Sequence, residues 1–144
     1  QCPPSWEPFV MPFIEWAECE QLEVVDVEGV ISNSDKEFNT AGTIDLLAIH
    51  NGKLALFDYK TREVAEHQDI TRKGYHKDCM QLAAESRMVK IASYLDYDPP
   101  IYTVIINTNN GDTHVKKWTE QAQAKALDDA ISCFMFYDLV NKMR

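Results

Sequence analysis

The sequence predicts a single α/β domain in which helices flank a mixed central sheet, for three reasons. First, the chain has 144 residues, 45% of them hydrophobic, which suits one domain with one core. Second, apolar patterns along the chain follow the order helix, three strands, helix, strand, short strand, helix. Third, no internal repeat or linker divides the chain, so residues 1–144 are expected to form one domain.

The boundaries of these elements follow from apolar spacing and from turn residues. Apolar residues at helical spacing predict a helix from Phe9 to Glu20, and Pro12 falls in its first turn, where proline is tolerated. A strand rich in Val and Ile comes next and ends before the turn residues of 33–36. In full, we expect helices at 9–20, 76–94 and 119–143, and strands at 22–31, 41–50, 53–59, 101–107 and 113–117.

The second and third strands are predicted to form a hairpin. Asn51-Gly52 separates them, and this dipeptide between two apolar runs is the strongest short-range hairpin signal. The returning strand, Lys53 to Tyr59, is almost continuously apolar, which indicates a central position covered on both faces. In the last helix, Phe134, Phe136 and Tyr137 are expected to pack in the core rather than to stack with bases.

The charge of the chain argues against nucleic-acid binding, but its distribution does not. The net charge is −9 and the pI is about 4.8, whereas phosphate contacts require Lys and Arg. Half of the fourteen basic residues nevertheless lie between positions 60 and 90, so a local surface for phosphate can coexist with a negative total. These residues are Lys60, Arg62, Arg72, Lys73, Lys77, Arg87 and Lys90.

Several other classes of protein are excluded by simple features. The four cysteines are scattered without a close pair, which argues against zinc sites and iron–sulfur clusters. No apolar stretch reaches the roughly 18 residues of a membrane span, and no secretory signal is visible, so we expect an intracellular protein of the cytoplasm, of a host cell's cytoplasm or of an organelle. The chain begins at Gln1 rather than Met, which is compatible with a missing N-terminal segment.

Asp45, Asp58 and Lys60 form the strongest candidate site. The hairpin makes their two strands neighbours, and residues two apart in a strand share one face of a sheet. A carboxylate and an ammonium group on a buried apolar strand are costly unless they have a function. Carboxylate and carbonyl oxygens are the ligands that Mg²⁺ and Mn²⁺ prefer, so Asp45, Asp58 and the Tyr59 carbonyl are candidate metal ligands. Lys60 would orient the attacking water or offset charge on a phosphate.

The run Gly42-Thr43-Ile44-Asp45, followed after twelve residues by Asp58-Tyr59-Lys60-Thr61, resembles the PD-(D/E)XK nuclease superfamily. It is most similar to the RecB-like branch, which includes phage exonucleases and the mitochondrial genome maintenance exonuclease. The resemblance covers roughly residues 22–107 and implies a restriction-endonuclease-like αβββαβ core, Mg²⁺ or Mn²⁺ as cofactor, DNA as substrate, and a role in DNA recombination or repair.

The resemblance also implies roles for further residues. Gln81, in Gln81-Leu82-Ala83-Ala84, matches the helix glutamine of the family and becomes a catalytic and substrate-binding candidate. Many relatives have a Tyr four residues later, where this chain has Glu85, and a catalytic His before the first strand, where this chain has none. Glu28 is the preferred substitute for that His as a metal ligand, and the alternatives are Glu23 or a His in a segment absent from this chain. The further residues expected to contact DNA are Thr61, Arg62, Tyr75 and Lys77.

The function expected from the sequence is therefore a divalent-metal-dependent DNA nuclease, with exonuclease favoured over endonuclease. One alternative is a resolvase or restriction-type endonuclease. Another is a nuclease fold that has lost cleavage and serves in binding or assembly, which the acidic charge and the missing His favour. Single- or double-strand preference, polarity and oligomeric state leave no signal in the sequence.

Overall fold

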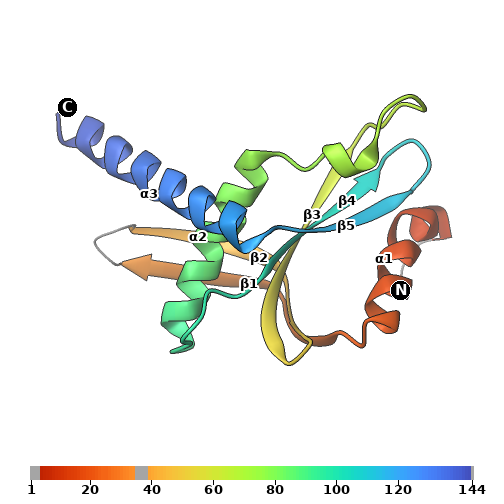
Figure 1. Cartoon of the computed structure of the whole chain (residues 1–144), viewed down its shortest axis with the longest axis horizontal. Helices are drawn as coiled ribbons and strands as arrows, with labels where there is room; N and C mark the ends of the chain where they lie inside the picture. Colours follow the sequence, from red (N-terminus) through yellow and green to blue (C-terminus); the bar gives the residue numbers. More distant parts are fainter. Residues whose placement is uncertain (1–3, 35–38, 144) are drawn as a thin grey trace.

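The computed structural model describes residues 4–34 and 39–143 and confirms the expected mixed α/β fold (Figure 1). The order of its longer elements begins with the αβββαβ series predicted from the sequence. Most boundaries differ from the expected ones by a few residues, and the strands at 101–107 and 113–117 agree fully. Asn33 and Ser34 of the expected turn belong to β1, and the rest of that turn lies outside the described residues. The elements are η1 (Pro4–Trp6), α1 (Glu7–Cys19), β1 (Glu23–Ser34), β2 (Asn39–His50), β3 (Lys53–Arg62), η2 (Ile70–Arg72), α2 (His76–Ala92), β4 (Ile101–Asn107), β5 (Thr113–Lys117) and α3 (Glu120–Lys142).

The five strands form one mixed sheet in the order β1-β2-β3-β4-β5. Neighbouring strands are antiparallel except β3 and β4, which run parallel because α2 lies between them in the chain. In the hairpin, Asn51 and Gly52 both have positive φ, of 52° and 78°, as the predicted tight turn requires. The central position expected for the apolar strand 53–59 is confirmed.

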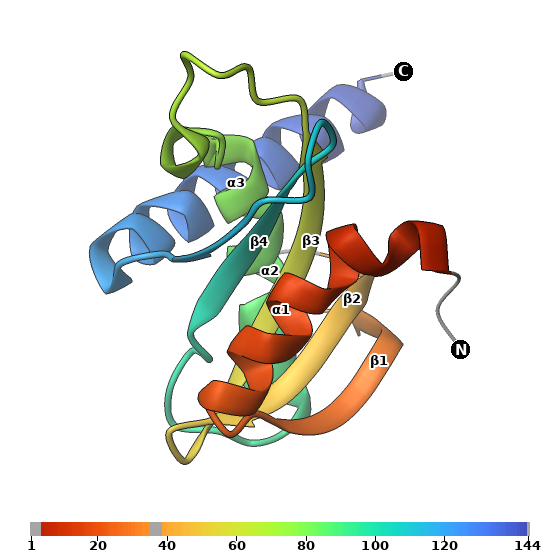
Figure 2. The ribbon, with the colours of Figure 1, turned by 90° about the vertical axis from the view of Figure 1, so that its right-hand side faces the viewer.

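One face of the sheet is covered by α1 (Figure 2). Phe13 of α1 lies over Phe57 and Tyr59 of β3, with ring centroids 6.0 and 5.5 Å apart. Phe57 stacks on Tyr102 of β4 at 4.6 Å, so aromatic rings from three elements form this layer. Pro12 lies inside α1 rather than in its first turn, since the helix begins at Glu7.

The opposite face is covered by α2, and α3 packs against α2 (Figures 1 and 2). Leu56 of β3 and Ile101 of β4 meet Leu82 and Val89 of α2 in this core, and all four are at most 3% exposed. None of the helices in the described residues combines the length and the hydropathy that a membrane-spanning segment needs.

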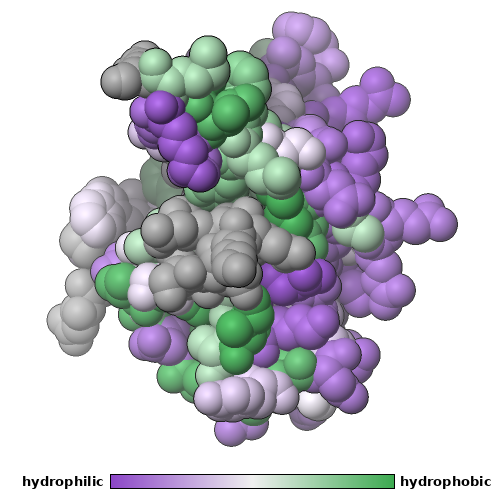
Figure 3. All heavy atoms as spheres, turned by 90° about the vertical axis from the view of Figure 1, so that its left-hand side faces the viewer, coloured by the Kyte–Doolittle hydropathy of each residue, from purple (hydrophilic) through white to green (hydrophobic). Residues whose placement is uncertain are grey.

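The first half of α3 packs as expected, but its second half does not. Ala126 and Ala130 are buried against α2, whereas Phe136 and Tyr137 are 69% and 67% exposed. The expectation that these two aromatic residues pack in the core is therefore wrong, because α3 crosses α2 and its second half projects away from it (Figure 1). Only Phe134 of the three is partly buried and packs against the core. Hydrophobic side chains consequently gather where α3 ends, in the upper part of Figure 3.

An ion pair between Arg62 and Asp78, with two hydrogen bonds, holds the start of α2 against the end of β3. Both carboxylate oxygens of Asp78 accept hydrogen bonds from Nη2 of Arg62, at 3.1 and 3.0 Å. Oδ2 of Asp78 also accepts from the backbone N–H of Tyr75, at 3.0 Å, which satisfies a free donor at the helix start. The Tyr75 ring lies under the guanidinium, 5.1 Å from its central carbon. Asp78 is buried, so this pair also satisfies a carboxylate inside the protein.

We expect Asp78→Ala to lower the free energy of unfolding by about 2–3 kcal/mol, because it leaves Arg62 without its partner. The loss should be smaller than for a fully buried pair, since the Arg62 side chain is 20% exposed. Urea denaturation measures it. Asp138→Ala removes the exposed ion pair with Lys142 and is the matched control, with no measurable loss expected. Equal stability of both variants and the wild type would contradict this assignment.

Candidate active site

The candidate site lies where the sheet forks. Pairing between β2 and β3 ends at Leu46 and Phe57, and the next facing positions are Asp45 and Asp58. Before Asp45, β2 pairs only with β1, and after Phe57, β3 pairs only with β4. The two aspartates therefore face each other at the point where the hydrogen-bonded ladder opens, as the hairpin predicts. Facing residues of an antiparallel pair lie on the same side of the sheet.

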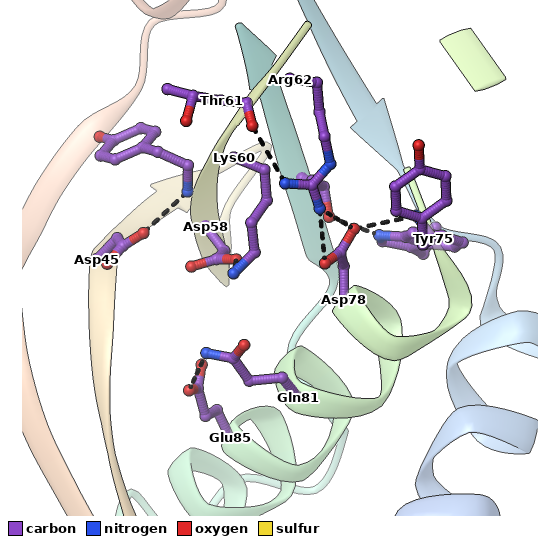
Figure 4. Close-up of polar contacts among 12 residues, drawn as sticks. Asp45, Asp58, Lys60, Thr61, Arg62, Tyr75, Asp78, Gln81 and Glu85 are labelled. Carbon is purple, nitrogen blue, oxygen red and sulfur yellow. Dashed lines mark hydrogen bonds and ion pairs between the residues drawn. The ribbon is translucent and has the colours of Figure 1, made fainter. Parts of the chain in front are cut away.

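Asp45 is held by the backbone of β3. Its Oδ2 accepts a hydrogen bond from the N–H of Tyr59 at 2.8 Å, in place of the carbonyl that a continued ladder would offer (Figure 4). Because the N–H and C=O groups of one strand residue point to the same side, the Tyr59 carbonyl also faces this opening. The Tyr59 side chain points the other way and contacts Phe13. Two predicted metal ligands, Asp45 and the Tyr59 carbonyl, are thus placed at the fork.

Asp58 and Lys60 lie on the α2 face of β3 and form an ion pair. The Lys60 Nζ is 3.0 Å from Oδ2 of Asp58. Asp58 is only 4% exposed, and Oδ2 is buried without a hydrogen-bond partner among the described residues, so the lysine contributes charge rather than a well-directed hydrogen bond. A buried carboxylate oxygen without a donor is costly and suits a cation ligand. The shared face predicted for these two residues is confirmed.

The pKa of Asp58 is raised to about 6 from its ordinary value of 3.8. Burial is the largest cause, followed by the neighbouring carboxyl of Asp45, while Lys60 opposes both. Two carboxylates that face each other in a partly buried place repel, so one of them favours a proton. A bound cation would reverse this preference.

Glu85 is a third carboxyl group at the site, and no role was predicted for it from the sequence. Its Oε1 accepts a hydrogen bond from Nε2 of Gln81 at 3.2 Å, and both side chains point from α2 towards Asp58 and Lys60 (Figure 4). A Cβ added at Gly42 would lie 3.2 Å from Oε1 of Glu85, so the glycine of Gly-x-x-Asp leaves room for this carboxyl. The pKa of Glu85 is raised to about 7, mainly by burial and also by the charges of Asp58 and Asp45, while the hydrogen bond from Gln81 and the charge of Lys60 oppose the shift. The spacing of four residues from Gln81 was the signal, because it places both on one helix face.

Glu28 lies on β1 across from Asp45, between the pairs Val27–Leu46 and Gly29–Ile44. It is exposed, and its φ of 53° lies in the left-handed region, so the strand is irregular at this point. Glu23, the alternative, lies at the start of β1 and pairs with Ile49, away from the fork. Among the described residues, no three His, Cys, Asp or Glu side chains are gathered closely enough to hold a metal ion. The structure therefore does not bring Glu28 together with Asp45 and Asp58.

The residues predicted to contact DNA differ in how far they are already engaged in contacts within the protein. Arg62 is engaged by Asp78, and Tyr75 packs beneath it, so both already have structural contacts. Thr61 and Lys77 are exposed, on β3 and on the first turn of α2. Gln81 is exposed beside Glu85 and reaches towards Lys60 (Figure 4). DNA contact stays a prediction for all of these residues.

Comparisons with known proteins support the fold. No family model and no curated protein matches the sequence. A crystal structure from Eubacterium rectale, described as a "Putative exonuclease", matches with a TM-score of 0.61 and 14% identity, over 88% of this chain and 48% of that one. A second solved structure, SSO0001, matches at a TM-score of 0.41 and 15% identity, over 87% of this chain and 57% of that one. The chain spans about half the length of these structures. The first likeness shows a shared fold, and the second is too weak to carry an argument.

The raised pKa of Glu85 predicts a specific pH dependence of stability without metal. A carboxyl whose pKa rises from 4.5 to about 7 on folding favours the folded state fully below about pH 4.5 and loses this contribution as the pH rises through 7. Glu85→Gln removes the titration. In EDTA, we expect the decrease in Tm between pH 5 and pH 8 to be smaller in the variant by roughly 4 °C. Glu15→Gln, at an exposed position of α1, should follow the wild type. Parallel curves for all three proteins would show that Glu85 is not responsible.

Proposed function

We propose that this chain is a divalent-metal-dependent DNA nuclease domain. The observation that carries the proposal is the pair of facing carboxyls, Asp45 and Asp58, at the fork, with Lys60 on the same face. The unsatisfied Oδ2 of Asp58 adds a reason for a cation at this place. The fold shared with the Eubacterium rectale protein, and the name given to that protein, favour an exonuclease.

The donor set fits Mg²⁺ or Mn²⁺. Mg²⁺ in such sites is held by one or two carboxylates and keeps several waters, so it does not need three side chains. Asp45, Asp58 and the Tyr59 carbonyl would hold the ion, and Glu85 is near enough to act on it electrostatically. When bound, the ion supplies an activated water and offsets the charge of the leaving oxygen.

The remaining steps belong to residues of this chain. The Lys60 ammonium, 3.0 Å from Asp58, is placed to orient the attacking water or to stabilise charge that develops on the phosphate. Gln81 holds Glu85 and presents its exposed amide towards the same space, where it can bind a phosphate or sugar oxygen. The sheet fixes Asp45, Asp58 and Lys60, while α2 fixes Gln81 and Glu85, so the machinery comes from rigid elements.

Lys60→Ala should lower the rate of DNA cleavage by at least about 100-fold while the fold survives. The assay uses fluorescent linear single- and double-stranded DNA with Mg²⁺, with Mn²⁺ and with EDTA. Lys125→Ala, an exposed change on α3, is the control and should cleave like the wild type. Circular DNA in the same assay separates the alternatives, since only an endonuclease opens a circle. Full activity of Lys60→Ala would refute the site, and metal-dependent DNA binding without cleavage by well-folded wild type would favour a binding module.

Metal binding should depend on pH because Asp58 must lose its proton to bind a cation. With its pKa at about 6, the affinity for Mn²⁺ should fall about tenfold per pH unit below that value and level off above it. Isothermal titration calorimetry between pH 5 and pH 8 measures this. Asp58→Asn should bind Mn²⁺ far more weakly at every pH, whereas Asp128→Asn, on the exposed side of α3, should not differ from the wild type. Unchanged affinity in Asp58→Asn would remove Asp58 from the ligand set.

A further inference from the structure

An apolar cavity opens directly beside the candidate site. Its volume is about 230 Å³, and it lies between the start of β2 and the packed helices α2 and α3. Gly42, Gln81 and Glu85 line it on the side of the site, and Met80, Met88 and Phe134 line the other side. We refer to it as the α2–α3 pocket.

The pocket and the candidate site share two side chains. Gln81 and Glu85 line the pocket and also point towards Asp58 and Lys60 (Figure 4). Gly42, three residues before Asp45 on β2, also lines the pocket on the side of the candidate site. A group in the pocket would therefore be continuous with whatever lies over the two aspartates. For the proposed nuclease, that neighbour is the phosphodiester being cut.

The chemistry of the walls suits a flat apolar group with polar edges. The surface is almost entirely apolar, with polar atoms supplied by Gln81 and Glu85 near the site. Met80 and Met88 are flexible and polarisable and adapt well to a ring, as thioether–aromatic contacts show. One N–H of the Gln81 amide is engaged by Glu85, which leaves one donor and the carbonyl oxygen to pair with the edge of a heterocycle. A volume of about 230 Å³ is below the range of drug-sized pockets, roughly 300–1,000 Å³, and fits one such ring system.

We propose that the α2–α3 pocket holds one unpaired base of the DNA strand being cut, from a nucleotide next to the scissile phosphate. This inference rests on the proposed nuclease function and adds a substrate class to it. A base can enter such a pocket only when it is unstacked and unpaired, which costs little in single-stranded DNA and more in a duplex. The protein therefore prefers single-stranded DNA or frayed ends to intact duplex. Stacking and apolar contact with the pocket supply the affinity that phosphate contacts alone would not.

The test uses two changes: DNA that lacks one base, and a protein variant in which the pocket is filled. Oligonucleotides with one abasic site at successive positions are bound to the protein in Mg²⁺, in a Lys60→Ala background that prevents cleavage, and binding is followed by fluorescence anisotropy. Loss of the base at one position should weaken binding by about tenfold, and loss at most others should matter little. This scan uses a protein with an unaltered pocket, so it does not depend on whether a pocket variant folds.

A double-mutant cycle then assigns the effect to the pocket. Cys133 is exposed and lines the pocket, so Cys133→Trp fills it from the rim. We expect this variant to bind intact single-stranded DNA about tenfold more weakly and to become insensitive to the critical abasic site. The matched control is Cys19→Trp, at an exposed cysteine on α1, which covers the other face of the sheet, and it should keep the full sensitivity.

The outcomes separate this inference from the nuclease proposal. If the wild type cleaves DNA with metal but no abasic position matters, or if Cys133→Trp keeps the same sensitivity, the pocket does not hold a base and the nuclease assignment stands. If well-folded protein neither binds nor cleaves DNA, both proposals fail. Tighter binding of duplex than of single strands would also overturn the pocket proposal, since a paired base cannot enter.

Discussion

Side chains along β3 alternate between the two faces of the sheet, and the α2 face receives Leu54, Leu56, Asp58, Lys60 and Arg62 in turn. Leu56 is buried under α2 and Leu54 is partly buried there, and together they favour this register of the strand. The next two residues reach the fork, and Arg62 fastens the first turn of α2 through Asp78. A shift of one residue in register would move all five to the α1 face. The alternation of side chains along β3 therefore contributes to the core, places Asp58 and Lys60 on one face, and positions α2, which carries Gln81 and Glu85 to the site.

The site is electrostatically unfavourable when no cation is bound. Burial and the charge of Asp45 raise the pKa of Asp58, and burial and the charges of both aspartates raise the pKa of Glu85, while Lys60 opposes both shifts. The rest of the fold offsets this unfavourable free energy, because the paired strands and the buried face of α2 keep the carboxyl groups from moving into water. Such conflicts between local charge and burial are common at functional sites, where a ligand resolves them. For three carboxyls in a partly buried place, the ligand that resolves the conflict is a cation or a set of protons.

Sequence patterns predicted the fold well, because most of its signals are local. The Asn51-Gly52 turn and the apolar run after it determine the hairpin, and the facing aspartates follow from that pairing. Glu85 was different, since its role depends on how closely α2 lies over Gly42, a distance between elements far apart in the chain. The aromatic residues of α3 show the same limit. Helical spacing identifies an apolar face, but it does not reveal that α3 crosses α2 at an angle and leaves Phe136 and Tyr137 uncovered.

For the proposed nuclease function, the acidic charge of the chain limits how DNA would be held. Of the seven basic residues between positions 60 and 90, Lys60, Arg62 and Arg87 are already paired with aspartates. In the described part of the chain, Arg72, Lys73, Lys77 and Lys90 make no ion pair and remain for phosphate. Each phosphate contact strengthens binding and makes the affinity depend more steeply on salt concentration. Few contacts therefore imply weak electrostatic binding with a small salt dependence. In the proposed complex, affinity would then come mainly from the metal and from contact with bases. The proposed role of the α2–α3 pocket would supply the contact with a base that so few available cations leave necessary.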